Sequence, residues 1–170
     1  DVCYFTGASP QTLKGLERSG LVAFSQEEVL RVPKGESASG GPIVLSEEQQ
    51  NAYDGVLALA DGESASCALL YGVTGSGKTA VYIRLLQEIV RRGRRGMILV
   101  PEIALTPQMM ARFSAYFADR VVMLHSGLRM SERYDQWKRI RRGEVDVVLG
   151  TRSAVFAPMQ NLGMIILDEE

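Results

Sequence analysis

The sequence predicts an α/β protein in which a parallel sheet carries helices on both faces. Between Leu45 and Glu170, short apolar segments alternate with longer amphipathic ones. Short β-branched segments such as Val121–Leu124 are typical of buried strands, and their alternation with helices favours a parallel sheet. A glycine-rich stretch, Gly72–Thr79, lies between a predicted strand and a predicted helix, where such sheets bind ligands.

The composition narrows the class of protein. Of 170 residues, 46% are apolar and 23% charged, which is typical of a globular domain, or one domain with a small appendage. The 19 basic and 20 acidic residues nearly cancel, so net charge neither indicates nor excludes nucleic acid. Cys3 and Cys67 are too few for a disulfide framework or metal cluster. No apolar run approaches the roughly 20 residues of a membrane span, so we expect no membrane partner and a cytoplasmic location.

The first 32 residues predict a small unit of their own. Ser9 and Pro10 are typical of a helix start, and Gly20 of a helix end. Apolar residues on either side of a polar break then predict a hairpin over 21–32. So short a stretch cannot hold a core, and the chain begins without Met and ends in acidic residues, so we expect a fragment of a longer protein. The predicted division is a small unit at 1–32, a linker rich in Gly, Pro and Ser at 33–42, and a large unit at 43–170.

Along the large unit, helices and strands are predicted to alternate. Ser46 caps its first helix, which extends to about Leu59, and Pro107 suits the first turn of a later one. The remaining predicted helices cover about 78–92, 106–117 and 131–142. The predicted strands are 67–71, 97–100, 121–124, 145–149 and 164–167.

The strongest motif is a phosphate-binding loop. It consists of Gly72, Val73, Thr74, Gly75, Ser76, Gly77, Lys78 and Thr79 and matches GxxxxGK[ST]. Glycines let the backbone amides converge on phosphate oxygens, and the helix N-terminus adds positive charge. We expect Lys78 to reach the terminal phosphates and the Thr79 hydroxyl to bind Mg²⁺.

A second motif is the acidic end of the last predicted strand. Ile165, Ile166 and Leu167 precede Asp168 and Glu169. We expect Asp168 to hold Mg²⁺ through water and Glu169 to orient and deprotonate the attacking water. With Lys78, these acids form the predicted catalytic set.

Gln49 is the predicted reader of the base. Its amide offers a donor and an acceptor that match the edge of adenine, and it lies shortly before the phosphate loop. The neighbouring Gln50 competes for this role, and an ordinary exposed helix residue is an open alternative.

Two further loops follow predicted strands and carry hydroxyls and a guanidinium. The candidates for binding a nucleic-acid backbone are Thr106, Thr151, Arg152 and Ser153. Helix caps and turns explain the same residues equally well. We expect His125, which ends another strand, to be structural, and Trp137 to pack against the sheet.

Taken in order, these segments resemble one family. GVTGSGKT, VPEIALTPQM, LHSGL, GTRSAVFAP and NLGMIILDEE closely resemble the PriA family (primosomal protein N′) of bacterial replication-restart helicases, in helicase superfamily 2. The resemblance covers about Leu45 to Glu170. It implies that this region is the first RecA-like lobe, truncated at the DEE box, and that the first 32 residues are the end of a winged-helix domain.

The resemblance also implies an activity. The longer protein would use ATP and Mg²⁺ to translocate 3′ to 5′ on DNA, remodel stalled forks and start primosome assembly. Its implied partners are single-stranded and forked DNA, other primosome proteins and single-stranded DNA-binding protein. Zinc is expected in the longer protein, but its cysteine cluster is not in this sequence. Nor is the second lobe with its arginine, so this chain alone would hydrolyse little ATP.

The sequence leaves other classes open. A RecG-type or restriction-type translocase shares the lobe, but the PEIALT and GTRSAVFAP segments argue against it. A phosphate-binding module without motor function, such as a kinase or GTPase, is a second class, although an NKxD motif is absent. A DNA-binding module with a vestigial ATP site is a third, against which the complete set of Lys78, Thr79, Asp168 and Glu169 argues.

Overall fold

The computed structural model describes the chain as two compact units, Asp1–Arg31 and Val32–Glu170. The described residues are 7, 9–24, 40–62 and 64–168. Of the elements formed by these residues, one helix belongs to the first unit and all four strands belong to the second.

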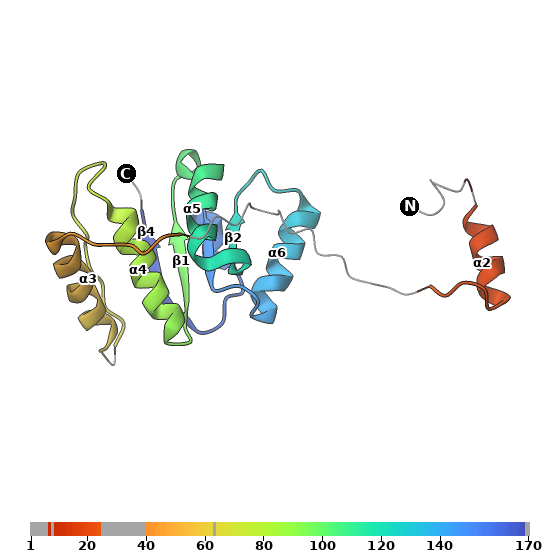
Figure 1. Cartoon of the computed structure of the whole chain (residues 1–170), viewed down its shortest axis with the longest axis horizontal. Coiled ribbons are helices and arrows are strands. Elements are labelled where there is room, and N and C mark those ends of the chain that lie inside the picture. Colours follow the sequence, from red (N-terminus) through yellow and green to blue (C-terminus); the bar gives the residue numbers. More distant parts are fainter. Residues whose placement is uncertain (1–6, 8, 25–39, 63, 169–170) are drawn as a thin grey trace. The chain divides into compact units, whose positions relative to one another are not determined.

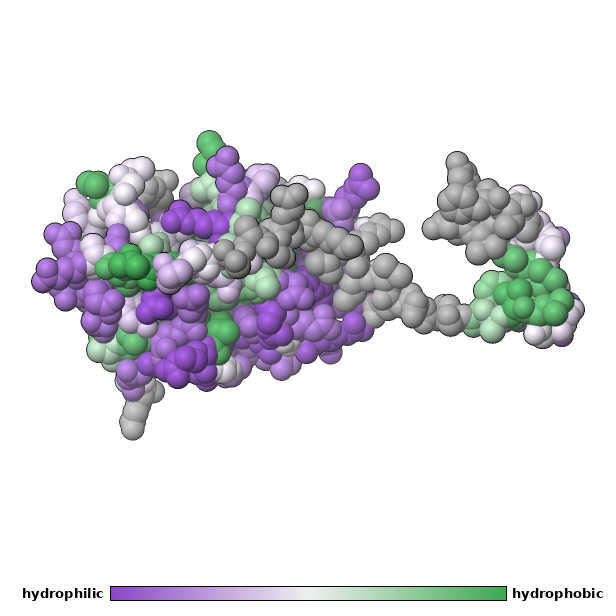
Figure 2. Space-filling model, viewed as in Figure 1, coloured by the Kyte–Doolittle hydropathy of each residue, from purple (hydrophilic) through white to green (hydrophobic). Residues whose placement is uncertain are grey.

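The first unit contains the helix predicted from its caps. Helix α2 spans Pro10–Arg18, and the Ser9 hydroxyl accepts a hydrogen bond from the Thr12 amide at 3.2 Å. None of its side chains is buried. Figure 2 shows apolar side chains gathered on the surface of this unit, where Leu21 and Phe24 are exposed. Residues 21–24 form no strand, and the rest of the predicted hairpin lies outside the described residues.

The second unit is built on a parallel sheet (Figure 1). Its strand order is β2-β3-β1-β4, and β1 pairs in parallel with both of its neighbours. Ile98 at the centre of β1 lies opposite Leu149 on one side and Ile166 on the other. The strands are β1 (Arg95–Leu99), β2 (Val121–Leu124), β3 (Val147–Gly150) and β4 (Leu162–Leu167).

Helices precede β1 and occupy the connections that follow it, as predicted. The α-helices are α3 (Glu47–Ala60), α4 (Lys78–Arg91), α5 (Pro107–Phe117) and α6 (Met130–Arg142). Short 3₁₀ turns are η1 (Glu102–Ala104), η2 (Ala118–Arg120) and η3 (Arg152–Phe156). Ser46 caps α3 and is part of a capping box with Gln49.

Both faces of the sheet are buried, because alternate strand residues point to opposite sides. Ile98 packs with Leu86 of α4 and Phe113 of α5 on one face. Met97 packs with Ile140 of α6 on the other face. The prediction of a parallel sheet covered on both faces is therefore confirmed.

One predicted strand is wrong. Residues 67–71 form no strand, and Leu69 and Tyr71 are each 91% exposed. Leu70 alone reaches a core cluster, the one between α3 and α4. A strand needs a partner for its backbone hydrogen bonds, and in the described part of the chain β4 is the last strand on that side of the sheet. An apolar composition does not supply that partner.

Candidate functional site

The phosphate loop has the backbone shape that its glycines predict. Gly75 and Gly77 adopt left-handed conformations, with φ of +84° and +83°, which a β-carbon disfavours. The Ser76 amide donates to the Val73 carbonyl at 3.1 Å. Helix α4 begins at Lys78, and no side chain caps its N-terminus. A helix start with uncapped amides and a glycine loop before it suits an anion.

Lys78 lies over this loop. Its Nζ donates a hydrogen bond to the Gly72 carbonyl oxygen at 2.8 Å, and the side chain is partly buried. The ammonium group is therefore at the loop, where a phosphate oxygen would replace a carbonyl as its acceptor. The role of Lys78 toward the terminal phosphates stays a prediction.

Gln49 bridges α3 and the phosphate loop. Its Nε2 donates to the Ser76 carbonyl at 2.8 Å, and its Oε1 accepts from the Ser46 amide at 3.0 Å. Both ends of the amide thus bind protein atoms, and the role in reading adenine stays a prediction. Gln50 donates instead to Asp54 within α3.

An open pocket of about 250 Å³ adjoins the loop. This is just under the roughly 300–1,000 Å³ that small-molecule sites occupy. Its walls combine apolar side chains with the Gln49 amide and the Lys78 ammonium. The lining residues are Glu48, Gln49, Ala52, Leu70, Tyr71, Gly72, Val73, Ser76, Lys78 and Val81.

Asp168 lies at the carboxyl end of β4 and faces α4. Its amide donates to the Leu99 carbonyl at 2.9 Å, and its Oδ1 accepts from the Tyr82 hydroxyl at 3.1 Å. Tyr82 is one turn beyond Thr79 on α4. The Asp168 carboxylate is therefore held against the first turns of the helix that carries Lys78 and Thr79. Glu169, the other predicted acid, lies outside the described residues.

The predicted magnesium ligands suit a hard cation. Thr79 would supply a hydroxyl and Asp168 a carboxylate, both oxygen donors of the kind Mg²⁺ prefers, with water completing the shell. Within the described ranges, no three His, Cys, Asp or Glu side chains gather as a metal cluster, and the predicted site does not require one.

The loop after β3 is tied to its neighbouring strands. The Val100 amide donates to the Gly150 carbonyl at 2.9 Å, and the Thr151 amide to the Leu124 carbonyl at 3.2 Å. The hydroxyls of Thr151 and Ser153 lie 3.3 Å apart. These bonds bring three of the predicted backbone-binding residues, Thr151, Arg152 and Ser153, to the carboxyl edge of the sheet.

Thr106, the fourth predicted residue, has a structural task as well. Its hydroxyl accepts from the Met109 amide at 3.2 Å and caps α5. The open alternative of a helix cap is thus realised here, while its role toward nucleic acid stays a prediction.

Several contributors were missed by sequence reasoning. Tyr82 could have been noticed, because it lies on α4 three residues after Thr79, but its contact with Asp168 is tertiary. Ser126 donates to the Glu102 carboxylate and so joins the loops after β1 and β2. Trp137 was expected to pack against the sheet, yet it is 38% exposed and lines a pocket.

Among the described residues, none of the helices is both long enough and apolar enough to cross a lipid bilayer.

The parallel sheet, the glycine loop that opens α4 and the facing carboxylate define a P-loop nucleotide-binding domain. The model of the DEAD/DEAH box helicase family matches residues 46–170. The chain belongs to the DEAD/DEAH box helicase family, whose members bind ATP with Mg²⁺. The predicted RecA-like lobe is confirmed by this match and by the sheet.

Relatives that resemble this chain include replication restart proteins PriA from three organisms. The chain is 44% identical to the replication restart protein PriA of Bacillus subtilis over 172 residues, which is 100% of this chain and 21% of that protein. It is 44% identical to the PriA of Synechocystis, over 95% of this chain and 19% of that protein. It is 50% identical to the PriA of Haemophilus influenzae, over 60% of this chain and 14% of that protein. The resemblance to PriA is confirmed, and the chain spans about a fifth or less of these curated relatives.

Proposed function

We propose that this chain is the ATP-binding lobe of a DNA helicase that restarts replication at stalled forks and moves 3′ to 5′ on single-stranded DNA. The observation that carries the proposal is the hydrogen bond from Tyr82 to Asp168 at 3.1 Å. It supports a site in which the phosphate loop and the acidic strand end act together. Similarity to PriA of Bacillus subtilis along the whole chain supports the replication-restart role.

In this site Lys78 exchanges its bond to the Gly72 carbonyl for a terminal phosphate oxygen of ATP. The amides of the loop hold the remaining phosphate oxygens. Thr79 would hold Mg²⁺ directly and Asp168 would hold it through water, and the ion would supply positive charge beside the phosphates. Glu169 orients the attacking water and accepts its proton. Gln49 turns from the Ser76 carbonyl toward adenine.

The DNA backbone binds along the same carboxyl edge of the sheet, at the loops after β1 and β3. Thr106, Thr151 and Ser153 offer hydroxyls, and Arg152 offers a guanidinium. Hydrolysis changes the position of a second lobe, and the loops after β1 and β3 transmit that change to DNA. Forked DNA, primosome proteins and single-stranded DNA-binding protein are the proposed partners, in the cytoplasm. Zinc is proposed for the longer protein alone.

The proposal also assigns the unit at 1–32 to the end of a winged-helix domain, joined to the lobe by a linker at 33–42. The chain alone hydrolyses little ATP, because the arginine that stabilises the transferring phosphoryl group belongs to the second lobe. Such an arginine is worth roughly 10³- to 10⁵-fold in rate.

A test of the phosphate site uses Lys78→Ala, with Lys14→Ala in α2 as the matched control. A fluorescent ATP analogue is titrated into this chain with Mg²⁺ present. We expect Lys78→Ala to weaken binding roughly 10- to 100-fold, the value of a charge-assisted hydrogen bond, and the control to bind like wild type. Equal affinity for the ATP analogue in wild type, Lys78→Ala and Lys14→Ala would overturn the assignment of the phosphate site.

The same pair in the full-length protein tests the motor. DNA should stimulate ATP hydrolysis in the control and not in Lys78→Ala. If the control hydrolyses ATP at the same rate with and without single-stranded DNA, the lobe is a nucleotide-binding module without motor function.

A further inference from the structure

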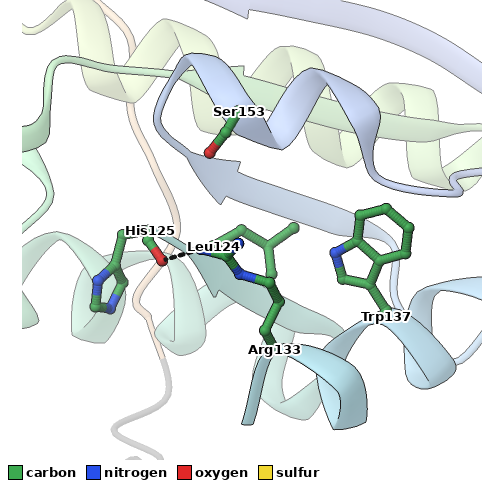
Figure 3. A pocket seen from close by; sticks show the side chains of 5 residues that line it. All are labelled: Leu124, His125, Arg133, Trp137 and Ser153. Carbon is green, nitrogen blue, oxygen red and sulfur yellow. Dashed lines mark hydrogen bonds between the residues drawn. The ribbon is translucent and has the colours of Figure 1, made fainter. Parts of the chain in front are cut away.

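A second, smaller pocket lies between α6 and η3, on the side of the lobe that carries the loop after β3 (Figure 3). Its volume is about 40 Å³, and its lining residues are Leu124, His125, Arg133, Trp137 and Ser153. Of these, only Ser153 belongs to a segment already assigned a role.

The polar groups of this pocket are mainly hydrogen-bond donors. The Arg133 Nη2 donates to the His125 carbonyl at 3.3 Å, which fixes the guanidinium at the pocket. Figure 3 shows the indole nitrogen of Trp137 and the hydroxyl of Ser153 facing the same space, while the His125 ring is directed away. No carboxylate is among the lining residues. One permanent positive charge with two further donors favours an anionic oxygen.

The size of the pocket limits its occupant. A water molecule needs roughly 10–15 Å³ measured in this way, so 40 Å³ accommodates about three oxygen-sized groups. A nucleobase is too large to enter. The oxygens of one phosphate group fit both the volume and the donors.

The walls of the pocket are held by backbone contacts. The Thr151 amide binds the Leu124 carbonyl at 3.2 Å and so ties the start of η3 to the end of β2. A β-carbon on Gly150 would lie 2.3 Å from the Ala154 Cβ and 2.7 Å from the Leu124 oxygen. The distance between Ser153 and the end of β2 is therefore set by close packing, and the pocket does not depend on a flexible loop.

We infer that Arg133 and Trp137 complete a binding site for a phosphodiester group of single-stranded DNA, together with Ser153. The inference rests on the proposed function, because Ser153 belongs to the proposed DNA-binding loop. It extends the DNA path from that loop onto α6. Arg133 supplies the positive charge, and the Trp137 indole N–H and the Ser153 hydroxyl donate hydrogen bonds that orient the phosphate.

The first experiment measures how DNA affinity depends on salt. The full 170-residue chain is titrated with end-labelled oligodeoxythymidylate, and binding is followed by anisotropy between about 20 and 200 mM salt. Each phosphate contact on a single strand contributes about 0.7 to the slope of log affinity against log salt. We expect Arg133→Gln to lower the slope by about this amount, and Arg133→Lys, which keeps the charge, to retain most of it.

The matched control is Arg141→Gln, on the exposed far end of the same helix. It removes the same charge and should leave the slope nearly unchanged. Thermal unfolding of each variant checks that α6 is intact. Equal slopes for wild type, Arg133→Gln and Arg141→Gln would overturn the inference, while the DNA binding seen by anisotropy would leave the proposed function standing.

The second experiment uses Trp137 itself, the one tryptophan of the chain. Its fluorescence should change on binding oligodeoxythymidylate, and to a similar extent on binding an abasic strand of equal length, because the phosphate is recognised. A change with bases only would overturn phosphate recognition in favour of base stacking on the indole. Unchanged fluorescence while anisotropy reports binding would also overturn the site. If anisotropy detects no DNA at all, the inference and the DNA part of the proposed function both fail.

Discussion

The loop at 72–79 and the loop at 150–154 both precede a helical segment, but different kinds of bond hold them. Side chains hold the first loop: the Gln49 amide from α3 donates to the Ser76 carbonyl, and the Lys78 ammonium at the end of the loop donates to the Gly72 carbonyl. The second loop is held by backbone bonds to β1 and β2 and by tight packing at Gly150. A long side chain can exchange its partner when a ligand arrives, whereas a packed backbone cannot.

This contrast suits the two proposed tasks. A nucleotide must enter and leave the first loop in every cycle, so exchangeable bonds are an advantage there. A loop that transmits motion to DNA must keep its shape under load. The comparison therefore predicts that substitutions in the second loop lower the free energy of unfolding more than those in the first loop.

The largest effect is expected at Gly150. In Gly150→Ala the new β-carbon meets Ala154 and the Leu124 oxygen at less than 3 Å, and overpacking of this kind costs about 1–3 kcal/mol. We expect the free energy of unfolding in urea to fall by about 3 kcal/mol, at the upper end of that range.

Gly55→Ala in α3 is the control for Gly150→Ala. No atom lies within 4 Å of the added β-carbon at Gly55, and alanine favours a helix over glycine by about 1 kcal/mol. This variant should gain stability. If Gly150→Ala were as stable as wild type, the second loop would accommodate an added β-carbon without cost, and it would not be held by close packing.

A smaller and more local effect is expected in the phosphate loop. Gly75→Ala and Gly77→Ala share the cost of a left-handed residue, about 1–2 kcal/mol. Only at Gly77 does the new β-carbon also meet the Gln49 Nε2, at 2.5 Å. We expect Gly77→Ala to lose about 1 kcal/mol more than Gly75→Ala, the value of one hydrogen bond.

A Gln49→Ala background provides the control for that difference. With the Gln49 amide removed, Gly75→Ala and Gly77→Ala should destabilise the lobe equally in urea unfolding. If the gap between them persists, Gln49 does not hold the loop, and the contrast between the two loops loses its main support.

The smallest effect is expected at Glu88, near the end of α4 that lies away from both loops. Hydrogen bonds from Arg91 and Arg92 lower the pKa of Glu88 from 4.5 to about 2. Because its pKa is lowered by folding, the Glu88 carboxylate stabilises the protein above pH 4.5, and this contribution is lost as the pH falls toward 2.

Thermal unfolding of Glu88→Gln tests that sign. The variant should melt slightly below wild type at about pH 7, and the two curves should converge as the pH is lowered from about 5 to about 2. Nucleotide affinity at neutral pH should be equal in both proteins. A difference in melting temperature that grows on acidification would contradict the assignment.

The sequence by itself determined the local features of this protein. Ser46 and the Thr106–Pro107 pair start helices through contacts within one turn, and the alternation of short apolar segments with amphipathic ones is enough to predict a parallel sheet. The glycines of the phosphate loop identify it because their left-handed conformations are a property of the residue. Such features depend on neighbours in the chain, so the sequence contains them.

Only the tertiary structure decided which distant groups meet. Residues 67–71 have an apolar composition that predicts a strand, but they form none. A strand needs a neighbouring strand to pair with, and composition does not show whether that neighbour is present. The contacts of Gln49 with Ser76, Tyr82 with Asp168 and Arg133 with the His125 carbonyl depend on how helices lie on the sheet. Packing of side chains across the two faces fixes those distances, and no periodicity along the sequence encodes them.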